Sequence, residues 1–239
     1  MGGFGIRATA GVLSWLVLAS SALADVGAFI SEVVAAHGGG AAPTAIHEVG
    51  VTQSQRRGAG PVERWWQSPD RFRIDIRYPG AEETRLLRGA DAWQQGQPAT
   101  APFHGALVLQ AARMALPWRL QANAGRVVDL GSLDSAAGRP VRVLEWAVQE
   151  GVKLIVDIDP ATRLVMRSRG ILTINNASME FATRYEDYRP VAGRLVAFVE
   201  QHFAMGQFIG TTTLQAIEFP DVLPDKVFSA PQSGLVLNR

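Results

Sequence analysis

A regular alternation of strand-like segments and turn residues dominates this chain. In residues 71–78, the apolar side chains of Phe72, Ile74 and Ile76 alternate with charged ones. Because successive side chains of a strand point to opposite faces, this segment predicts a β-strand with one apolar and one solvated face. Similar segments recur from residue 44 to residue 219, separated by Gly, Pro and Asn. The short, regular spacing predicts an antiparallel meander.

The expected strands make up most of the chain. They are residues 44–55, 61–67, 72–78, 82–88, 91–95, 126–130, 140–148, 152–158, 164–174, 178–185, 195–204 and 207–219. Gly58-Ala59-Gly60 is expected to form the turn of the first hairpin. The tail from Pro220 to Arg239 contains three prolines, so it is expected to wrap the surface without adding a central strand.

Two segments carry the spacing of amphipathic helices instead. Residues 26–36 have apolar residues at helical spacing and end at Gly38-Gly39-Gly40. In residues 103–120, Pro117 is expected to bend or end the helix, whose apolar stripe consists of Leu107, Ala111, Met114 and Trp118. The sequence therefore predicts a mainly β fold built on one strongly curved antiparallel sheet, which can close as a barrel or stay open. The two helices are the candidates to cover the bare apolar face of an open sheet.

The N-terminal 24 residues have the pattern of a cleaved secretory signal. Arg7 precedes an apolar run from Ala8 to Ala19, and Ala22-Leu23-Ala24 forms the small-x-small site that signal peptidase recognises. We expect cleavage between Ala24 and Asp25, a periplasmic location, and no transmembrane anchor afterwards. An uncleaved anchor is the alternative, but the run is shorter than the ~20 residues a spanning helix needs. Residues 25–239 are expected to form one domain.

The overall composition excludes several classes of function. The chain has no cysteine, which excludes disulfides, thiolate metal sites, a cysteine nucleophile and a cysteine-linked lipid anchor. Because Arg7 is the only charge before residue 25, the remaining 22 basic side chains equal the 22 acidic ones. A nucleic-acid partner would require a concentrated basic surplus, so none is expected.

Candidate catalytic and metal-binding residues are scattered. His37, His47, His104 and His202 form no catalytic or metal-binding motif. Asp157 and Asp159 would share one face of a strand and could bind a cation, but strand-end carboxylates beside a Pro turn are usually solvated. Glu186 and Asp187 are interpreted as a surface patch or salt-bridge corner. We expect no catalytic residue, no metal and no cofactor, although an enzyme or accessory subunit whose site no motif reveals stays an alternative.

Several short motifs occur in a characteristic order along the chain. They are Ser68-Pro69-Asp70-Arg71-Phe72-Arg73, Gly89-Ala90-Asp91-Ala92-Trp93, Ile158-Asp159-Pro160-Ala161-Thr162, the segment from Tyr185 to Gly193, and Phe228-Ser229-Ala230-Pro231. In this order the chain resembles the LolA/LolB-like superfamily of periplasmic lipoprotein carriers and lipoprotein-sorting proteins. That resemblance implies an unclosed barrel whose helical lid encloses an apolar cavity for lipoprotein acyl chains. The carriers have a lid-holding arginine where this chain has Ser68, which leaves dedicated lipoprotein shuttling open.

The resemblance and the apolar pattern together imply a lipid-binding cavity. Its expected lining residues are Trp66, Phe72, Ile74, Ile76, Leu86, Trp93, Leu107, Met114, Trp118, Leu144, Trp146 and Phe181. The expected partners are lipid or lipoprotein acyl chains, together with inner- or outer-membrane transport components. The function this implies is a carrier that transports or sorts lipoproteins towards the outer membrane without chemistry. The alternative is a periplasmic sensor or regulatory binding module on the same fold.

Overall fold

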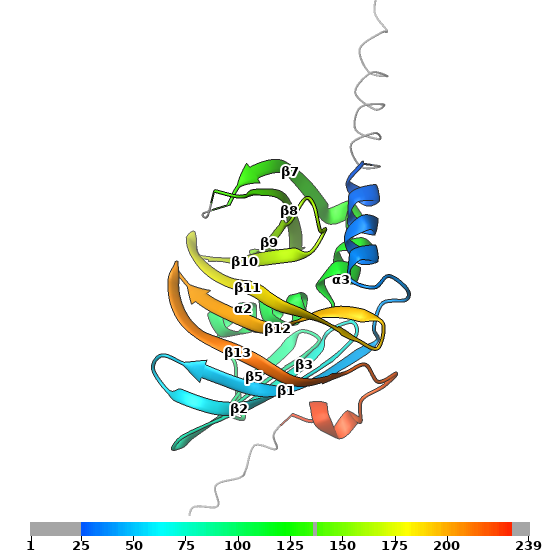
Figure 1. Cartoon of the computed structure of the whole chain (residues 1–239). Coiled ribbons are helices and arrows are strands. Elements are labelled where there is room, and N and C mark those ends of the chain that lie inside the picture. The colour runs from blue at the N-terminus through cyan, green and yellow to red at the C-terminus, as the bar shows by residue number, and fades with distance from the viewer. Residues whose placement is uncertain (1–24, 136–137, 231–239) are drawn as a thin grey trace, which may run out of the picture.

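One antiparallel sheet of 13 strands forms most of the molecule (Figure 1). The computed structural model describes residues 25–135 and 138–230, so the expected signal sequence and the last nine residues lie outside it. The strands are β1 (Ala45–Ser54), β2 (Gly58–Gln67), β3 (Arg71–Tyr78), β4 (Ala81–Arg88), β5 (Asp91–Gln94), β6 (Gln97–Pro98), β7 (Val127–Asp134), β8 (Pro140–Gln149), β9 (Val152–Ile158), β10 (Val165–Ile174), β11 (Ala177–Val191), β12 (Arg194–Ala204) and β13 (Gln207–Glu218).

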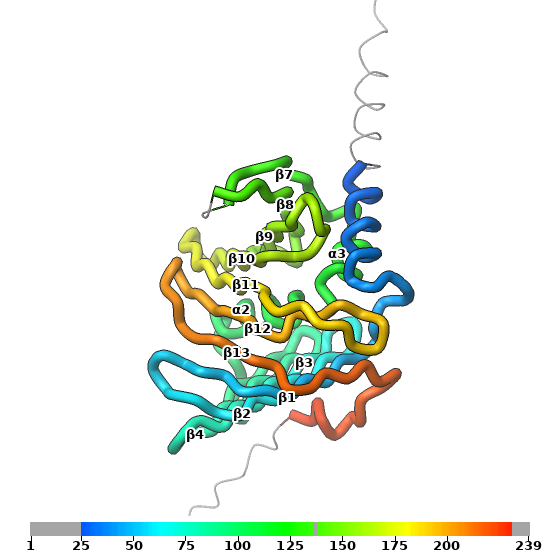
Figure 2. Tube along the Cα trace, in the orientation of Figure 1, coloured from blue at the N-terminus to red at the C-terminus, as the bar shows by residue number. Residues whose placement is uncertain are grey.

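The sheet is strongly curved but not closed. Its strand order is β6-β5-β4-β3-β2-β1-β13-β12-β11-β10-β9-β8-β7, with the short β6 and the strand β7 at the two edges. The first strand, β1, pairs with the last, β13. The strands that begin and end the meander in sequence therefore lie side by side in the middle of the sheet. Figure 2 shows the trace curling around the helices from both sides. The expected open, curved antiparallel sheet is confirmed.

Some element boundaries differ from those expected. Gly58 and Gly60 belong to β2, where Gly58 pairs with Ser54, and the turn consists of residues 55–57. Gly60 is required in the strand because a Cβ there would lie 2.2 Å from the Arg77 carbonyl oxygen. Strand β11 continues through Pro190 to Val191, so the next turn contains only Ala192 and Gly193. Backbone pairing with β12 continues to Val191, so the strand is longer than the alternating apolar pattern predicts.

The expected helix over residues 103–120 is two helices, α2 (Ala101–Arg113) and α3 (Leu116–Ala122). The break lies at Ala115, which adopts a left-handed conformation with φ of 52°. Pro117 follows in the first turn of α3, where its missing N–H costs no hydrogen bond. Residues 25–36 are helical, as expected, and two 3-10 turns, η1 (Ala124–Arg126) and η2 (Asp225–Phe228), complete the described helices.

Helix α2 bridges the concave side of the sheet. It packs against β9 and β10 on one side and against β3, β4 and β5 on the other. The approach to β10 is close because two glycines face large side chains. A Cβ on Gly105 would lie 2.3 Å from the Leu172 side chain, and one on Gly170 would lie 2.7 Å from that of Leu109. The helix therefore crosses the concave face of the sheet and packs directly against β10.

The convex side of the sheet carries a smaller apolar cluster. It contains Ala45, Leu86, Leu223 and Phe228, with Trp65 and Trp93 packed against it. The described part of the tail, residues 220–230, wraps this outer face, as expected. Among the described helices, none combines the length and apolarity required to cross a membrane.

Candidate functional site

A cavity of about 1080 Å³ lies between α2 and the concave face of the sheet. Ligand pockets usually occupy about 300–1,000 Å³, so this volume lies slightly above that range. The lining side chains come from strands β1, β2, β3, β11, β12 and β13 and from both helices of the insert. These strands include the middle of the sheet, over which α2 passes. The cavity is thus the space that the bridging helix leaves open.

Apolar side chains form one wall of the cavity. Phe72, Ile74 and Ile76 project from β3, whose alternating pattern places all three on the concave face. Leu107 and Met114 face them from the helical insert and belong to the same apolar cluster. This wall can contact a hydrocarbon chain without exposing polar backbone, because the sheet hydrogen bonds satisfy the backbone groups of β3.

The structure brings seven of the twelve expected lining residues together around this cavity. These are Phe72, Ile74, Ile76, Leu107, Met114, Trp118 and Phe181. Two others, Leu86 and Trp93, lie in the cluster on the convex face. Leu144 and Trp146 lie in the apolar core that includes Phe29, Ile30 and Val33 of the N-terminal helix. Trp66 belongs to the core beside β3 without lining the cavity. The structure thus places these five residues outside the lining of this cavity.

Trp66 and Trp146 hold a cation from the helical insert. The guanidinium of Arg119, on α3, lies 5.8 Å from the ring centre of Trp66 and 5.3 Å from that of Trp146. Its Nη1 also donates a hydrogen bond of 2.6 Å to the carbonyl oxygen of Ala111. Burial lowers the pKa of Arg119 to about 10. Since Trp66 is on β2 and Trp146 is on β8, Arg119 connects the two arms of the open sheet through the insert.

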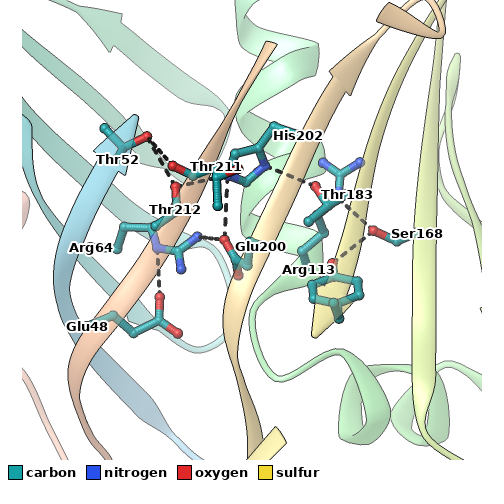
Figure 3. A network of polar contacts seen from close by, with 11 residues as sticks. Glu48, Thr52, Arg64, Arg113, Ser168, Thr183, Glu200, His202, Thr211 and Thr212 are labelled. Carbon is teal, nitrogen blue, oxygen red and sulfur yellow. Dashed lines mark hydrogen bonds and ion pairs between the residues drawn. The ribbon is translucent and has the colours of Figure 1, made fainter. Parts of the chain in front are cut away.

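A network of charged and polar side chains crosses the middle strands (Figure 3). Arg64 on β2 lies between two carboxylates: its Nε is 2.7 Å from Glu48 Oε2, and its Nη1 is 2.7 Å from Glu200 Oε2. All three residues line the cavity. The Arg64 Nη2 atom is buried and has no hydrogen-bond partner among the described residues. The cavity floor therefore contains a buried donor group that no described residue satisfies.

Hydrogen bonds extend this network along the floor. His202 lies with Nε2 2.9 Å from the Thr212 hydroxyl and Nδ1 3.4 Å from the Thr183 hydroxyl. The Thr212 hydroxyl in turn donates to that of Thr52 at 3.3 Å. These four residues also line the cavity. A strip of hydroxyl and imidazole groups thus lies beside the Arg64 ion pairs.

Arg113 connects the helix to the same network. Its Nε donates to the Ser168 hydroxyl at 2.9 Å, and its Nη2 donates to the Phe181 carbonyl oxygen at 2.6 Å. The Ser168 hydroxyl lies 2.9 Å from that of Tyr185. Burial raises the pKa of Tyr185 to about 12, so its hydroxyl stays protonated. Arg113 therefore ties the C-terminal end of α2 to strands β10 and β11.

Burial shifts the protonation of the floor groups. Loss of hydration raises the pKa of Glu48 to about 7, against the opposing charge of Arg64. Burial alone would raise the pKa of Glu200 as well, but the Arg64 charge holds it below its ordinary value. Burial lowers the pKa of His202 to about 4, so this imidazole is neutral at neutral pH. The floor consequently combines fixed charges with groups that change charge within the range of natural pH.

One end of the cavity adjoins the N-terminal helix. His37 is buried there, with Nδ1 2.8 Å from the Val33 carbonyl oxygen and its ring edge against Tyr188. Arg194 lies over the ring of Trp118, with its Cζ 5.7 Å from the ring centre, and donates to the Ala41 carbonyl oxygen at 3.0 Å. The backbone N–H of Leu195 donates to the His37 carbonyl oxygen, which joins the helix to β12. Aromatic and cationic side chains therefore frame this end.

The other end of the cavity is bordered by hairpin turns. Gln55, Arg56 and Arg57 lie in the β1–β2 turn, and Gln207, Phe208 and Ile209 begin β13; all six line the cavity. The backbone N–H of Gln55 donates to the Ile209 carbonyl oxygen at 3.1 Å, so the two hairpins lie side by side.

Several other candidate residues are occupied by structural contacts. His47 lies 2.8 Å from Glu63 and stacks on Trp65, and the half-buried His104 contacts the Ala90 carbonyl oxygen. Asp157 pairs with Arg169, and Asp159 accepts hydrogen bonds from the backbone of its own turn. These Asp159 hydrogen bonds lower its pKa. Within residues 25–135 and 138–230, no three His, Asp or Glu side chains are grouped as metal ligands.

Two further surface positions lie away from the cavity. Asp187 pairs with Arg189 at 2.6 Å, and its exposed neighbour Glu186 completes the expected surface corner. Ser68 is exposed in the turn between β2 and β3, where its backbone N–H donates to the Thr44 carbonyl oxygen at 2.8 Å. The role of holding the insert falls to Arg119 and Arg113, which come from the helices themselves.

The polar floor was missed by sequence reasoning. Three of its residues occupy charged positions in alternating strands, and such positions normally face solvent. They are Glu48, Arg64 and Glu200. The available signal was spacing: Arg64 is two residues from both Val62 and Trp66, so all three share one strand face. A charge on an otherwise apolar face indicates a buried polar site.

Comparison with known proteins shows the same architecture in solved structures. A LolA superfamily protein from Nitrosomonas europaea superimposes with a TM-score of 0.54 at 13% identity, covering 85% of this chain and 97% of the other. A DUF1329 family protein from Desulfovibrio piger superimposes with a TM-score of 0.53 at 10% identity, covering 87% and 96%. No family profile matches the sequence, and no curated protein matches it. The fold is LolA-like.

Proposed function

We propose that the protein is a periplasmic carrier that binds lipid or lipoprotein acyl chains in the cavity under α2 and delivers them towards the outer membrane without chemistry. The observation that carries this proposal is the cavity of about 1080 Å³ between the helical insert and the open sheet. A filled sheet sandwich would leave no such space, whereas a carrier requires it. The likeness in fold to a LolA superfamily protein supports the same role.

The energetics of acyl-chain transfer suit this architecture. Each buried CH₂ group gains ~0.8 kcal/mol relative to water, so a single chain provides ample affinity. A membrane offers the same gain, so transfer between the two is nearly neutral. Differences in the contacts of α2 and α3 between an empty and an occupied cavity can then decide the direction of transfer.

The polar floor favours an amphiphile over a pure hydrocarbon. Among the described residues, Arg64 Nη2 and, on α2, Gln110 Oε1 are buried without a hydrogen-bond partner, and both residues line the cavity. Unpaired buried polar atoms are costly. Because neither atom has exposed surface in the structure, an ester, amide or carboxyl group of the ligand would pair with them only after the Arg64 and Gln110 side chains turn towards the cavity. The ligand we infer has an acyl chain against β3 and Leu107 and a polar group above the floor.

Export is the part of the proposal that rests on residues 1–24. Their pattern of Arg7, an apolar run and Ala22-Leu23-Ala24 is that of a cleaved signal. N-terminal sequencing of the secreted protein should give Asp25 as the first residue. A secreted form that retains Met1 would contradict the proposal of cleavage.

Native mass spectrometry of the protein purified from a bacterial periplasm tests the carrier proposal. We expect copurified molecules with masses of acylated lipids. Titration of delipidated protein with saturated fatty acids of 8, 10 and 12 carbons should then show affinity rising roughly fourfold per CH₂. No copurified lipid and an affinity independent of chain length would contradict the proposed function.

A further inference from the structure

The hairpin between β12 and β13 exposes a group of large apolar side chains. Met205 is 62% exposed, Phe208 39% and Ile209 45%. Met205 stands at the tip, where it and Gly206 adopt left-handed conformations. Single exposed apolar residues need no explanation, but three in five consecutive positions at the end of one hairpin form a patch.

Cationic side chains border this apolar patch. Arg56 and Arg57 lie in the neighbouring β1–β2 turn, which is hydrogen-bonded to Ile209. Arg184 lies over the ring of Phe203, with its Cζ 5.0 Å from the ring centre, and that ring packs edge-on against Phe208. We call the six residues Arg56, Arg57, Arg184, Met205, Phe208 and Ile209 the rim.

The rim carries a net positive charge. Arg57 pairs with the buried Glu83, which also pairs with Arg85. Arg56 and Arg184 have no carboxylate within ion-pair distance among residues 25–135 and 138–230. The nearby Glu180, whose backbone N–H contacts the Met205 sulfur, is paired with Arg167. Two unpaired arginines therefore flank the apolar tip.

The rim is continuous with the cavity. Arg56, Arg57, Phe208 and Ile209 all line it, so the patch lies at the cavity mouth. Apolar side chains that enter the acyl boundary, together with arginines at headgroup level, are the combination that binds the surface of an anionic bilayer. A protein partner alone would not require the patch to coincide with the entrance of a cavity for lipid.

We propose that the rim docks the protein on an anionic lipid bilayer, with the mouth of the cavity facing the headgroups. The inference that docking serves lipid transfer rests on the function proposed above, whereas docking itself does not need an occupied cavity. Apolar side chains of the rim enter the interface, and Arg56 and Arg184 contact lipid phosphates.

Flotation with ligand-free vesicles tests this proposal. The protein is mixed either with vesicles of pure phosphatidylcholine or with vesicles of phosphatidylcholine that contain about 30% phosphatidylglycerol. Each mixture is measured at low and at high salt. We expect recovery with the anionic vesicles only, falling as salt rises. Arg56→Gln and Arg184→Gln should each lower the partition coefficient roughly fivefold. Met205→Glu should lower it about tenfold or more, because it removes apolar contact and adds repulsion.

Two matched controls separate docking from general changes of surface. Val222→Glu alters an apolar side chain that is 67% exposed and lies away from the rim. Its neighbour Leu223 donates a backbone hydrogen bond to Gln67, which is at the end of β2 opposite the β1–β2 turn. Arg126→Gln removes an exposed arginine outside the rim. Neither control should change recovery. Equal losses in controls and rim variants, or no recovery of the wild-type protein, would overturn the proposal.

A second readout distinguishes failure of docking from failure of the proposed carrier function. Met205 does not line the cavity, so Met205→Glu should bind a soluble fatty acid with the wild-type Kd while losing vesicle binding. If the wild-type protein binds fatty acid but never vesicles, docking is wrong and the carrier proposal stands. If it binds vesicles but no fatty acid, the carrier proposal is wrong and docking stands.

Discussion

Arg113 on α2 donates a hydrogen bond of 2.9 Å from Nε to the hydroxyl of Ser168 on β10, a residue with no exposed surface. This bond fixes the C-terminal end of α2 to one wall of the sheet. At the other end of the helix, His104 contacts the Ala90 carbonyl oxygen at 3.1 Å, beside β5. The helix is thus held at both ends above the middle strands, and the cavity lies beneath its span.

The seating of α2 on β10 leads to a first prediction. Gly170→Ala should lower the free energy of unfolding by about 1–3 kcal/mol, because its new Cβ would lie 2.7 Å from the fully buried Leu109. Gly125→Ala is the matched control, since a Cβ there meets nothing within 4 Å. It should stay within ~0.5 kcal/mol of the wild type. Urea denaturation measures both, and equal stability of the two variants would show that the helix is not seated as described.

Arg119 provides a second prediction. Arg119→Ala removes a buried cation from between Trp66 and Trp146 and leaves the Ala111 carbonyl oxygen without that donor. We expect a loss of about 2 kcal/mol in the free energy of unfolding. Arg88→Ala is the control, because Arg88 lies over Trp93 at a similar distance of 5.7 Å but is exposed. That variant should lose less than ~1 kcal/mol. Equal losses would mean that Arg119 does not connect the arms of the sheet.

The polar floor predicts opposite pH dependences for two variants. The pKa of Glu48 is about 7 in the folded state against 4.5 as the ordinary value, so its contribution is full below pH 4.5 and falls as pH rises to 7. The pKa of His202 is about 4 against 6.5, so its contribution is lost as pH falls from 6.5 to 4. In the wild type these two slopes oppose each other between pH 4.5 and 6.5.

Removal of either group should reveal the slope of the other. Relative to the wild type, we expect the stability of His202→Gln to fall with rising pH across this window, and that of Glu48→Gln to rise, each by up to ~1.4 kcal/mol per pH unit. Urea denaturation at pH 4.5, 5.5 and 6.5 provides the comparison. Changes of slope with the same sign in the two variants, each relative to the wild type, would contradict the assigned shifts.

The outer cluster predicts a variant that affects stability alone. Phe228→Ala removes a ring that is 1% exposed and packs with Leu86 and Leu223 on the convex face. The free energy of unfolding should fall by about 3–5 kcal/mol. Since no atom of Phe228 lines the cavity, the Kd for dodecanoic acid should equal that of the wild type under conditions where the variant is folded. A weakened Kd would place the outer cluster in the binding site.

The sheet and the covering helices could be predicted from the sequence because hydrophobic periodicity and turn residues are local signals. The openness of the sheet has no such signal and is implied only by the resemblance to the LolA/LolB-like superfamily. Sequence reasoning could not assign the faces of β4, where Leu86 and Leu87 are adjacent and either could face inward. Leu87 packs in the inner cluster and Leu86 in the outer one, since the distant η2 covers the convex side. Leu144 and Trp146 face inward, as the pattern implies, but pack in the core with the N-terminal helix. Such long-range packing has no local signature.

The proposed function requires that the space under α2 hold an acyl chain, so a side chain that fills this space should weaken binding. Ala106 lines the cavity from α2, and Ala106→Trp would place an indole ring where the chain is proposed to lie. Ala81→Trp is the matched control, because Ala81 is exposed at the start of β4 and does not line the cavity.

Isothermal titration calorimetry with dodecanoic acid gives the decisive comparison. We predict that Ala106→Trp weakens binding by about tenfold or more, the expected loss when a side chain displaces several methylene groups. Ala81→Trp should bind as the wild type does. A folded Ala106→Trp protein with the wild-type Kd would show that the ligand does not occupy this cavity and would contradict the proposed function.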